Sequence, residues 1–581
     1  MHAPMKWIAI ALAGATLAAQ ARPAAACGCF APPSPTTPVV QAGERILFTH
    51  DGNQVTAYIQ IQYQGAAAEF GWLVPLPSVP TLELGSDELF RALQARTNPQ
   101  YSITTTRQFC YGGYATSSGS SGIGCGGSAD EASYGGASDL GVYATDLAAA
   151  SDAGESALVA KASIGPYDYA VLKADDKAEM LAWLDANRYY VPDATGAAVA
   201  PYIHPGAYFL ALKLRAGESA GDVVPVVLRY ASDLPMIPIT LTQVGAIPDM
   251  GVLVWFLGEA RAIPRNYYHV TLDEMPVWES LTSYPQQAIR AVHAAPGRHA
   301  FLTEYAGTSG VMFGQLDYAG RFGNLATLRS ITSPISYLGY LRSNGYTFDG
   351  TLFAILERYL PLPPELAAMG VTEAKFYGNY PAYASFMTGA DGGAPEDTFD
   401  PVALTNDLEA RVVRPLRAAA ALFVDHPYLT RMYTALSPED MNLDPVFSEN
   451  PDLPDVSSQH GATLTVPAVG DAWLRTEQGR EEQWVSSLPP NKIWPAAERV
   501  ERLREAGDPD VVVDNGATIA TKLGPVDHGQ ATCPAPQSPP PDDRHRDGCA
   551  CDVRRGVPSG ALGTFVLVAG AILLARRRRY R

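Results

Sequence analysis

The feature that most constrains this chain is an uncharged apolar run close to its C-terminus. Residues 557–575 carry no charge and consist mainly of Leu, Val, Ala, Gly and Phe. A helix of this length rises about 28 Å, close to the hydrocarbon thickness of a bilayer. Four arginines, 576–579, follow directly, and clustered arginines resist translocation. The sequence therefore predicts a transmembrane helix at 557–575, a cytoplasmic basic tail at 576–581 and a body outside the cytoplasm.

The N-terminus has the organisation of a secretory signal. Lys6 supplies a positive charge, residues 7–19 form an apolar stretch, and three alanines at 24–26 offer a cleavage site after Ala26. The apolar stretch is shorter than the roughly 20 residues that a membrane span needs. We therefore expect residues 1–26 to be a signal peptide. Cys27 would then be the first mature residue, either lipidated or, as we prefer, one half of a disulfide.

A cysteine pair precedes the predicted membrane helix. Cys549 and Cys551 lie in a linker, residues 533–556, whose sequence is rich in Pro, Asp and Arg. The order of cysteine, apolar helix and arginine cluster resembles the C-terminal sorting signals of myxobacterial (MYXO-CTERM) type. This resemblance implies a processing or anchoring site near Cys549 and Cys551, and a sorting or processing enzyme as a partner. The alternative is that Cys549 and Cys551 are ordinary disulfide-forming cysteines, whose partners the sequence does not identify.

The charge balance excludes one large class of partner. The 42 basic and 60 acidic residues include nine and one, respectively, in residues 1–26 and after Cys551, so the rest carries 33 against 59, a net charge of −26. Binding to nucleic acid needs a basic face, and docking onto anionic lipid headgroups needs one too. We expect neither. An apolar content of 47% is ordinary for a globular protein with a sizeable core.

Cysteine usage points to local disulfides in an oxidising compartment. The seven cysteines lie near the two ends and in one Gly/Ser-rich stretch: Cys27, Cys29, Cys110, Cys125, Cys533, Cys549 and Cys551. We predict a disulfide between Cys110 and Cys125, which bracket the start of a low-complexity insertion at 112–154. A metal site at Cys27 and Cys29 is the rival interpretation, but zinc sites normally use C-x2-C pairs with two further ligands. We predict no cofactor and no metal.

The first half of the body has the pattern of strands. Residues 44–49 and 54–63 flank a turn with Asp51 and Gly52, as in a hairpin. Further strands are expected at 208–215, 223–230, 237–244 and 251–257, and helices at 86–97, capped by Ser86, and at 175–187. We interpret residues 27–280 as a β-rich domain with an antiparallel sheet or sandwich.

The second half has a helical pattern. Helices are expected at 286–294, 337–343, 352–359 and 408–423, the last kinked by Pro415. We place a boundary near residues 278–284, a mixed α+β domain at 281–465 and a small extension at 466–532. The fold class predicted for the whole body is therefore α+β.

Seven short segments together resemble a bacterial family, the domain of unknown function 2330. They are residues 42–46, 60–63, 71–77, 165–168, 235–238, 249–255 and 301–305. The resemblance covers roughly residues 27–465. It implies a secreted or surface-anchored envelope protein. It implies no catalytic residues, because no activity is assigned to that family.

The sequence contains no established catalytic motif. None of the ten histidines forms H-E-x-x-H, and neither G-x-S-x-G, nor a P-loop, nor a dinucleotide fingerprint between a strand and a helix occurs. The most interesting polar group is Glu304 with Tyr305, on an apolar strand-like run near His299. A buried carboxylate beside a tyrosine can act as a general base. We favour the alternative that Glu304 is a hydrogen-bonded structural residue at the domain junction.

Three further groups of residues are weaker candidates for a functional site. Asp249 precedes a buried strand and is interpreted as a turn residue. A loop with Asp391, Glu396, Asp397 and Asp400 offers Ca²⁺ ligands without the order of a defined Ca²⁺ loop, so we interpret it as a solvated acidic loop. Several tyrosines could line a glycan- or protein-binding face, although most are expected to be half-buried: Tyr189, Tyr190, Tyr202, Tyr208, Tyr267, Tyr268, Tyr377 and Tyr380.

These observations favour a non-enzymatic binding or structural module of the cell envelope, held to a membrane by its C-terminal helix. A surface glycan or a protein is the expected partner. The alternative is an extracytoplasmic hydrolase with its site at the domain junction near Glu304. Titratable side chains that converge in one pocket at that junction would favour the enzyme, and clustered exposed tyrosines would favour binding.

Overall fold

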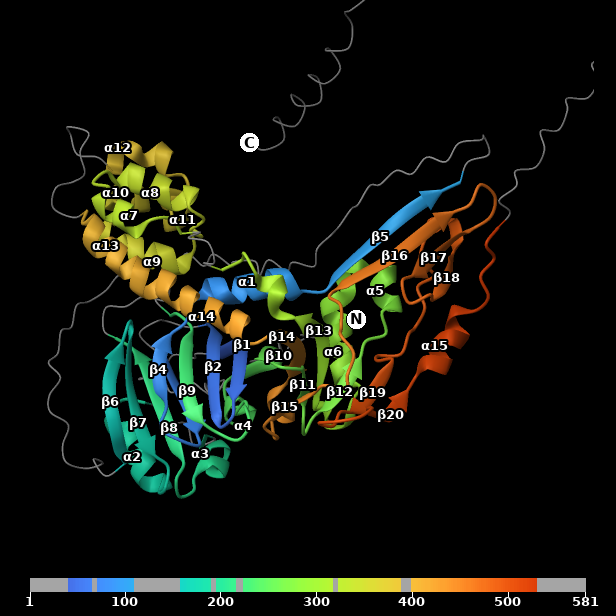
Figure 1. Cartoon of the computed structure of the whole chain (residues 1–581), viewed down its shortest axis with the longest axis horizontal. Coiled ribbons are helices and arrows are strands. Elements are labelled where there is room, and N and C mark those ends of the chain that lie inside the picture. The colour runs from blue at the N-terminus through green and yellow to red at the C-terminus, as the bar shows by residue number, and fades with distance from the viewer. Residues whose placement is uncertain are drawn as a thin grey trace, which may run out of the picture. The chain divides into compact units, whose positions relative to one another are not determined.

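The computed structural model describes residues 40–64, 70–108, 157–189, 195–215, 223–316, 322–387 and 399–529 (Figure 1). Several predicted features lie outside these residues: the signal peptide at 1–26, the insertion at 112–154, all seven cysteines and the apolar run at 557–575. Among the described helices, none is long and apolar enough to cross a membrane. All the described residues belong to the first of two units, Met1–Ala531.

A ten-stranded mixed sheet is the centre of the first unit. Its middle consists of β2 (Gln54–Gln64), β1 (Val40–Asp51), β10 (Ala246–Gly258) and β14 (Tyr428–Leu436). The prediction of an antiparallel sheet is wrong here in one respect, because β1 and β10 are parallel. Both are covered on their two faces, which is typical of parallel strands. Their near-continuous apolar sequences reflect this double burial.

Strands on both sides extend this sheet. One side adds β13 (Ala300–Thr308), β12 (Tyr268–Thr271), β19 (Arg499–Arg502) and β20 (Asp510–Asp514), and the other adds β9 (Val226–Ala231) and β4 (Thr81–Leu84). The domain boundary predicted near residues 278–284 therefore falls between strands that share one sheet. That segment forms α5 (Met275–Glu279) and the start of α6 (Tyr284–His293).

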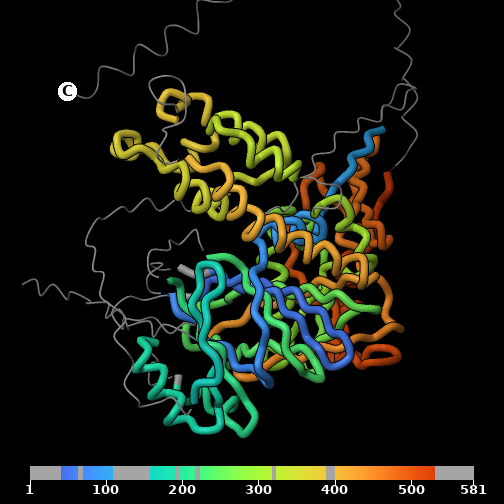
Figure 2. Tube along the Cα trace, turned by 60° about the vertical axis from the view of Figure 1, so that its left-hand side comes forward, coloured from blue at the N-terminus to red at the C-terminus, as the bar shows by residue number. Residues whose placement is uncertain are grey.

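A second sheet makes a sandwich with part of the first. It is antiparallel and consists of β3 (Gly71–Leu76), β8 (Tyr208–Leu214), β7 (Tyr167–Lys173) and β6 (Leu158–Ile164). Apolar side chains from both sheets, such as Phe48 of β1 and Trp72 of β3, belong to one buried cluster. Figure 2 shows the blue N-terminal strands beside this part of the chain. The sandwich predicted for the N-terminal region is present.

The local patterns of this region explain its elements. The β1–β2 hairpin turns through Gly52 and Asn53, and Gly52 adopts φ 64°, a conformation that glycine tolerates. Ser86 caps α1 (Asp87–Thr97) by accepting a hydrogen bond from the Glu88 amide, as predicted. Asp176 caps α2 (Lys177–Ala186), which covers the outer face of the second sheet together with α3 (Thr195–Val199).

The strand predicted at 237–244 is wrong. Residues Ile239–Thr242 form the short helix α4 instead. Pro235 and Pro238 both precede it, and a proline has no N–H to donate to a sheet. The apolar side chains of Ile239 and Leu241 are buried all the same. Apolar content alone therefore could not separate helix from strand here.

A cluster of helices packs on the other face of the large sheet (Figure 1). It comprises α7 (Leu325–Ser330), α8 (Pro334–Ser343), α9 (Gly350–Tyr359), α10 (Pro364–Ala368), α11 (Glu373–Gly378), α12 (Ala384–Met387), α13 (Pro401–Leu408) and α14 (Arg414–Asp425). The helices predicted at 337–343 and 352–359 are confirmed as α8 and α9. In place of a simple kink before Pro415, a π-helical turn, Glu409–Val413, joins α13 to α14.

A third sheet brings together distant parts of the chain. It consists of β5 (Gln100–Arg107), β16 (Gln459–Val466), β17 (Ala472–Thr476) and β18 (Glu481–Trp484), and β5 pairs with β16 in parallel. It shares a buried cluster with α5, α6 and α15 (Gly516–Leu523). A separate two-stranded ribbon consists of β11 (Arg261–Pro264) and β15 (Phe447–Asn450), which pair in an antiparallel manner. Along the chain, β15 is followed by β16 of the third sheet.

Candidate functional site

A pocket of about 460 Å³, lined by both polar and apolar side chains, lies where the third sheet meets the edge of the large sheet. We call it the junction pocket. Its polar lining comes from β5, β11, β12, β13, β16 and β19, from α6, from Glu274 just before α5, and from the loops after β15 and β19. The polar side chains that line it are Tyr101, Arg261, His269, Thr271, Glu274, Tyr284, Thr303, Glu304, Asp452, His460, Arg499, Glu501 and Asp508. The volume is within the range of small-molecule sites in proteins.

Glu304 lines the pocket, but both of its carboxylate oxygens are engaged. The Tyr284 hydroxyl donates to Oε1 at 2.5 Å, and Arg431 Nε donates to Oε2 at 2.6 Å. A register shift between Thr303 and Tyr305 turns β13 at this point. Burial and the neighbouring Glu304 charge raise the pKa of Tyr284 well above its usual range, so its hydroxyl stays a donor. Glu304 is therefore held as a paired carboxylate.

Arg431 connects Glu304 to the end of α1. Its Nη1 donates to Thr97 Oγ1 at 3.3 Å and also to Asn98 Oδ1. The guanidinium lies 5.3 Å from the centre of the Trp255 ring, and Trp255 Nε1 donates to the same Thr97 hydroxyl at 3.0 Å. The side chain of Arg431 is only 5% exposed. A buried charge needs such partners, because an unpaired one is costly.

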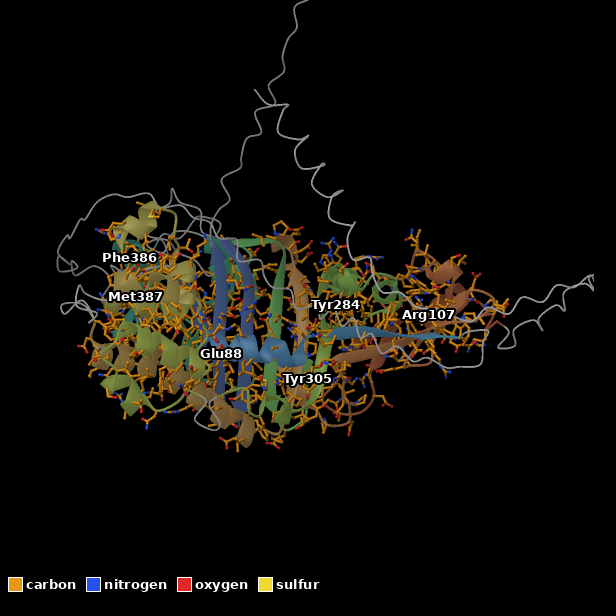
Figure 3. The ribbon with its side chains drawn as sticks, turned by 90° about the horizontal axis from the view of Figure 1, so that it is seen from above. Glu88, Arg107, Tyr284, Tyr305, Phe386 and Met387 are labelled. Atoms are coloured by element: carbon orange, nitrogen blue, oxygen red, sulfur yellow. The ribbon has the colours of Figure 1, made fainter. Side chains whose placement is uncertain are left out.

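The trio suggested by the sequence is not a functional unit. Tyr305 donates to the Thr308 carbonyl at 2.8 Å, and its side chain belongs to the helical cluster. His299 Nε2 contacts the Asp440 carbonyl at 2.8 Å. Neither side chain hydrogen-bonds the Glu304 carboxylate, whose partners are Tyr284 and Arg431. Tyr284 and Tyr305 lie apart in the view of Figure 3. The sequence identified Glu304 as buried but missed its true neighbours.

A histidine–carboxylate pair forms a second polar centre in the pocket. His269 Nδ1 lies 3.3 Å from Glu501 Oε2, and Arg261 Nη2 lies 3.3 Å from His269 Nε2. Burial lowers the pKa of His269, and the Arg261 charge adds to this effect. The hydrogen bond from His269 lowers the pKa of Glu501. The imidazole is therefore neutral, donates from Nδ1 to an ionised Glu501 and accepts at Nε2 from Arg261.

This arrangement resembles a general base only in part. A carboxylate that orients an imidazole is a common catalytic pair. Here the second ring nitrogen is already an acceptor for Arg261, and Arg261 in turn donates to the Pro454 carbonyl at 3.0 Å. Burial lowers the pKa of Arg261. The three side chains make a fixed polar wall that can offer hydrogen bonds to a ligand.

Aromatic rings form another part of the wall. Tyr101 stacks on His460, with ring centres 4.4 Å apart and planes inclined by 8°. Its ring also lies 5.0 Å from that of Trp278 and 5.6 Å from that of Tyr284. His460 Nδ1 contacts Glu274 Oε1 at 2.8 Å, which holds the imidazole in place. Flat rings beside charged hydrogen-bonding groups are suited to a polar ligand with apolar faces.

The remaining candidates have structural roles or lie outside the described residues. Asp249 adopts φ 54° and accepts a hydrogen bond from Ser437 Oγ at 3.2 Å, within β10 and not in a turn before it. Asp400 caps α13, because it accepts from the amides of Val402 and Ala403. The other three acidic candidates, Asp391, Glu396 and Asp397, lie outside the described residues. No group of three or more potential metal ligands occurs in the described part of the chain.

The described tyrosines among those considered for a binding face are all buried or partly buried. Tyr189, Tyr202, Tyr267 and Tyr377 are buried. Tyr208, Tyr268 and Tyr380 are partly buried, and Tyr190 lies outside the described residues. The tyrosines of the junction pocket, Tyr101 and Tyr284, were not among those proposed. No local pattern marked them, because β5 meets β16 across more than 350 residues of sequence.

Comparison with known proteins gives one match. The family model described as "Uncharacterized protein conserved in bacteria (DUF2330)" matches residues 23–322. This range includes Arg261, His269, Tyr284 and Glu304 of the junction pocket, and ends before Arg431, His460 and Glu501. No curated protein and no solved structure matches the chain.

Proposed function

For this chain, which belongs to the DUF2330 family of uncharacterised bacterial proteins, we propose the function of a ligand-binding module of the cell envelope. The body binds a surface glycan in the junction pocket. The predicted signal peptide exports it, and the predicted helix at 557–575 holds it to a membrane. Processing near Cys549 and Cys551 would remove that helix and make it an address for sorting.

The observation that carries this proposal is the state of the charged groups in the pocket. Glu304 is paired with Tyr284 and Arg431, and His269 is fixed between Glu501 and Arg261. Groups held in this way hydrogen-bond a ligand without reorganisation, which limits the entropic cost of binding. A glycan offers hydroxyls to such a wall and apolar ring faces to Tyr101 and Tyr284. The acidic body disfavours nucleic acid as a ligand.

A hydrolase remains the second candidate for a specific reason. Several titratable side chains converge in the junction pocket, Glu304 among them, and this is the arrangement expected from the sequence for an enzyme. A general base must reach the proton that it removes. Glu304 accepts hydrogen bonds from Tyr284 and Arg431, and His269 accepts one from Arg261, so a catalytic role would require one of these contacts to break. This requirement makes binding the function that the geometry supports better.

A binding titration with matched variants tests the proposal. The full-length protein is titrated with fragments of the cell-surface polysaccharide of its own bacterium. Arg499 lines the pocket and its side chain is 47% exposed, so Arg499→Ala alters the pocket without removing a buried group. Arg475→Ala is the control, because its side chain is 65% exposed and does not line the pocket.

We expect Arg499→Ala to weaken glycan binding about tenfold, the effect of one lost charge-assisted hydrogen bond. Arg475→Ala should bind as the wild type does. Release of reducing sugar ends during the titration would support the hydrolase instead. Failure of the wild-type protein to bind any fragment would refute glycan binding.

A further inference from the structure

A second pocket, of about 500 Å³, lies between the helical cluster and the sandwich. We call it the arginine pocket. Its helical wall comes from α9, α13, α14 and the π-helical turn, and its other wall from β2, β4, β9, the turn between β6 and β7, and the end of β8. The lining side chains that carry charge are Arg215, Arg358, Arg411, Arg414, Glu83 and Asp407.

The charge of this pocket is opposite to that of the protein. Four arginines and two carboxylates line it, whereas acidic residues outnumber basic ones 60 to 42 in the whole chain. Asp407 is paired with Arg358 at 3.8 Å, and Glu83 with Arg229, outside the lining, at 3.4 Å. An excess of positive charge in a recess attracts anions more strongly than the same charge on a flat surface does.

An irregular helical turn sets the position of Arg411 in this pocket. Pro415 has no N–H to donate to the carbonyl of Arg411, four residues before it, and a regular α-helix would bring its ring against that carbonyl. The chain widens into the π-helical turn Glu409–Val413, and the Arg414 amide donates to the Glu409 carbonyl. The turn buries the Arg411 side chain against the pocket. Such π-helical turns occur frequently at functional sites.

The other groups of the pocket add hydrogen-bonding capacity. Arg215 Nη1 donates to the Gly165 carbonyl at 3.4 Å, and its Nε lies 4.0 Å from Asp168, at the outer limit of an ion pair. Arg414 is exposed at the start of α14. Burial raises the pKa of Tyr58 to about 12, so its hydroxyl is a neutral donor on the sheet side. Guanidinium groups bind phosphate oxygens in a bidentate manner.

We infer that the arginine pocket binds a phosphate ester, held by Arg215, Arg358, Arg411 and Arg414 across the junction of the helical cluster and the sandwich. This site is separate from the junction pocket and does not depend on glycan binding there. The phosphate can belong to a soluble sugar phosphate or to a lipid headgroup, which present the same chemistry to the arginines.

Calorimetric titration of the full-length protein with inorganic pyrophosphate at low ionic strength tests this inference. The variant is Arg215→Gln combined with Arg414→Gln, because both side chains are largely exposed and their removal leaves the core intact. The control combines Arg417→Gln, on the same helix but outside the lining, with Arg475→Gln. Both doubly substituted proteins lose two positive charges.

We expect the wild type to bind pyrophosphate with an affinity that falls as salt is added. The pocket variant should bind at least about a hundredfold more weakly, roughly tenfold for each arginine removed, and the control should lose less than about threefold. The inference is overturned if the wild type does not bind pyrophosphate, or if both doubly substituted proteins lose the same affinity.

A second arm identifies the source of the phosphate. The same proteins are mixed with glucose 6-phosphate and, separately, with phosphatidylglycerol vesicles. Binding of the sugar phosphate alone assigns a soluble ester, and flotation with the vesicles that the pocket variant abolishes assigns a lipid headgroup. Vesicle binding that the pocket variant retains would place lipid contact elsewhere and count against the inference.

Discussion

Single residues of the junction pocket show how stability and function are linked at this site. Glu304 on β13 and Arg431 on β14 are both buried, and their ion pair joins two strands that are hydrogen-bonded to each other. Removal of one partner leaves the other as an uncompensated buried charge. The Glu304 carboxylate, which the sequence suggested as a general base, is therefore needed to neutralise Arg431.

Replacement of Glu304 separates these two roles. We expect Glu304→Gln to lower the free energy of unfolding by about 3 kcal/mol, because Arg431 loses its only carboxylate partner among the described residues. Glu505→Gln, which breaks an exposed pair with Arg265, should cost less than about 1 kcal/mol. Urea denaturation measures both. A Glu304→Gln protein with wild-type stability would contradict the structural role.

Glu44 provides a prediction on pH. It lies on β1 inside the sandwich, and burial raises its pKa from 4.5 to about 7, although Gln41 donates a hydrogen bond to it. Between these two pH values the native protein holds a proton that the unfolded chain has released. The free energy of unfolding should therefore fall as pH rises from 4.5 to 7, by roughly 3 kcal/mol from this residue.

Glu44→Gln should remove this part of the pH dependence. Urea denaturation of both proteins across the same pH window measures the difference, and Glu83→Gln, whose side chain is 52% exposed, is the matched control. Parallel stability curves for the wild type and Glu44→Gln would mean that Glu44 has the same pKa in the folded and the unfolded chain, and would contradict this prediction.

At the level of elements, the sequence predicted those whose signals are local. The cap at Ser86 and the apolar spacing of Leu89, Phe90 and Leu93 defined α1, and the Gly52 turn defined the β1–β2 hairpin. The sequence-based predictions failed where pairing between strands far apart in the sequence determines the structure. The parallel pairing of β1 with β10 and of β5 with β16 leaves no mark in any short window. The junction pocket depends on the second of these pairings.

Asp400 illustrates how a local role can be mistaken for a site. Its carboxylate accepts hydrogen bonds from two amides at 2.9 Å at the start of α13. We expect Asp400→Ala to lower the free energy of unfolding by about 1 kcal/mol, and Asp400→Asn, which retains an acceptor, to cost only a few tenths. Thermal denaturation with and without Ca²⁺ measures this. A Ca²⁺-dependent increase in Tm that only the wild type shows would instead support a cation site.

At the level of the whole molecule, one sheet joins strands from residues 40–64 to strands from residues 428–436 and 499–514. The large sheet is therefore complete only when both halves of the chain are present. The domains predicted from the change in composition were assigned by local helix and strand content, which does not report which strands share a sheet. Glu304 was expected at a junction between two domains; it lies on a strand of the large sheet, in a pocket that the third sheet also lines.

The proposed topology has a direct cellular consequence. If the signal and the membrane helix act as predicted, protease added to intact cells should cut the segment at 530–556 and release the body, residues 27–529, as a folded fragment. Immunoblotting of the supernatant with an antibody against the body measures this release. A cytoplasmic protein analysed in parallel should stay intact, and a body that resists protease until the cells are lysed would contradict exposure at the surface.

The central claim is that the junction pocket is a preorganised ligand site, and hydrogen–deuterium exchange of the full-length protein tests it most directly. Exchange is measured with and without the surface-polysaccharide fragments. Binding as proposed predicts slower exchange in β12, β13 and the segment from β19 to β20, which line the pocket. It predicts no change of exchange rate in the second sheet at β6 and β7. Unchanged exchange at the pocket, or protection confined to the second sheet, would contradict it.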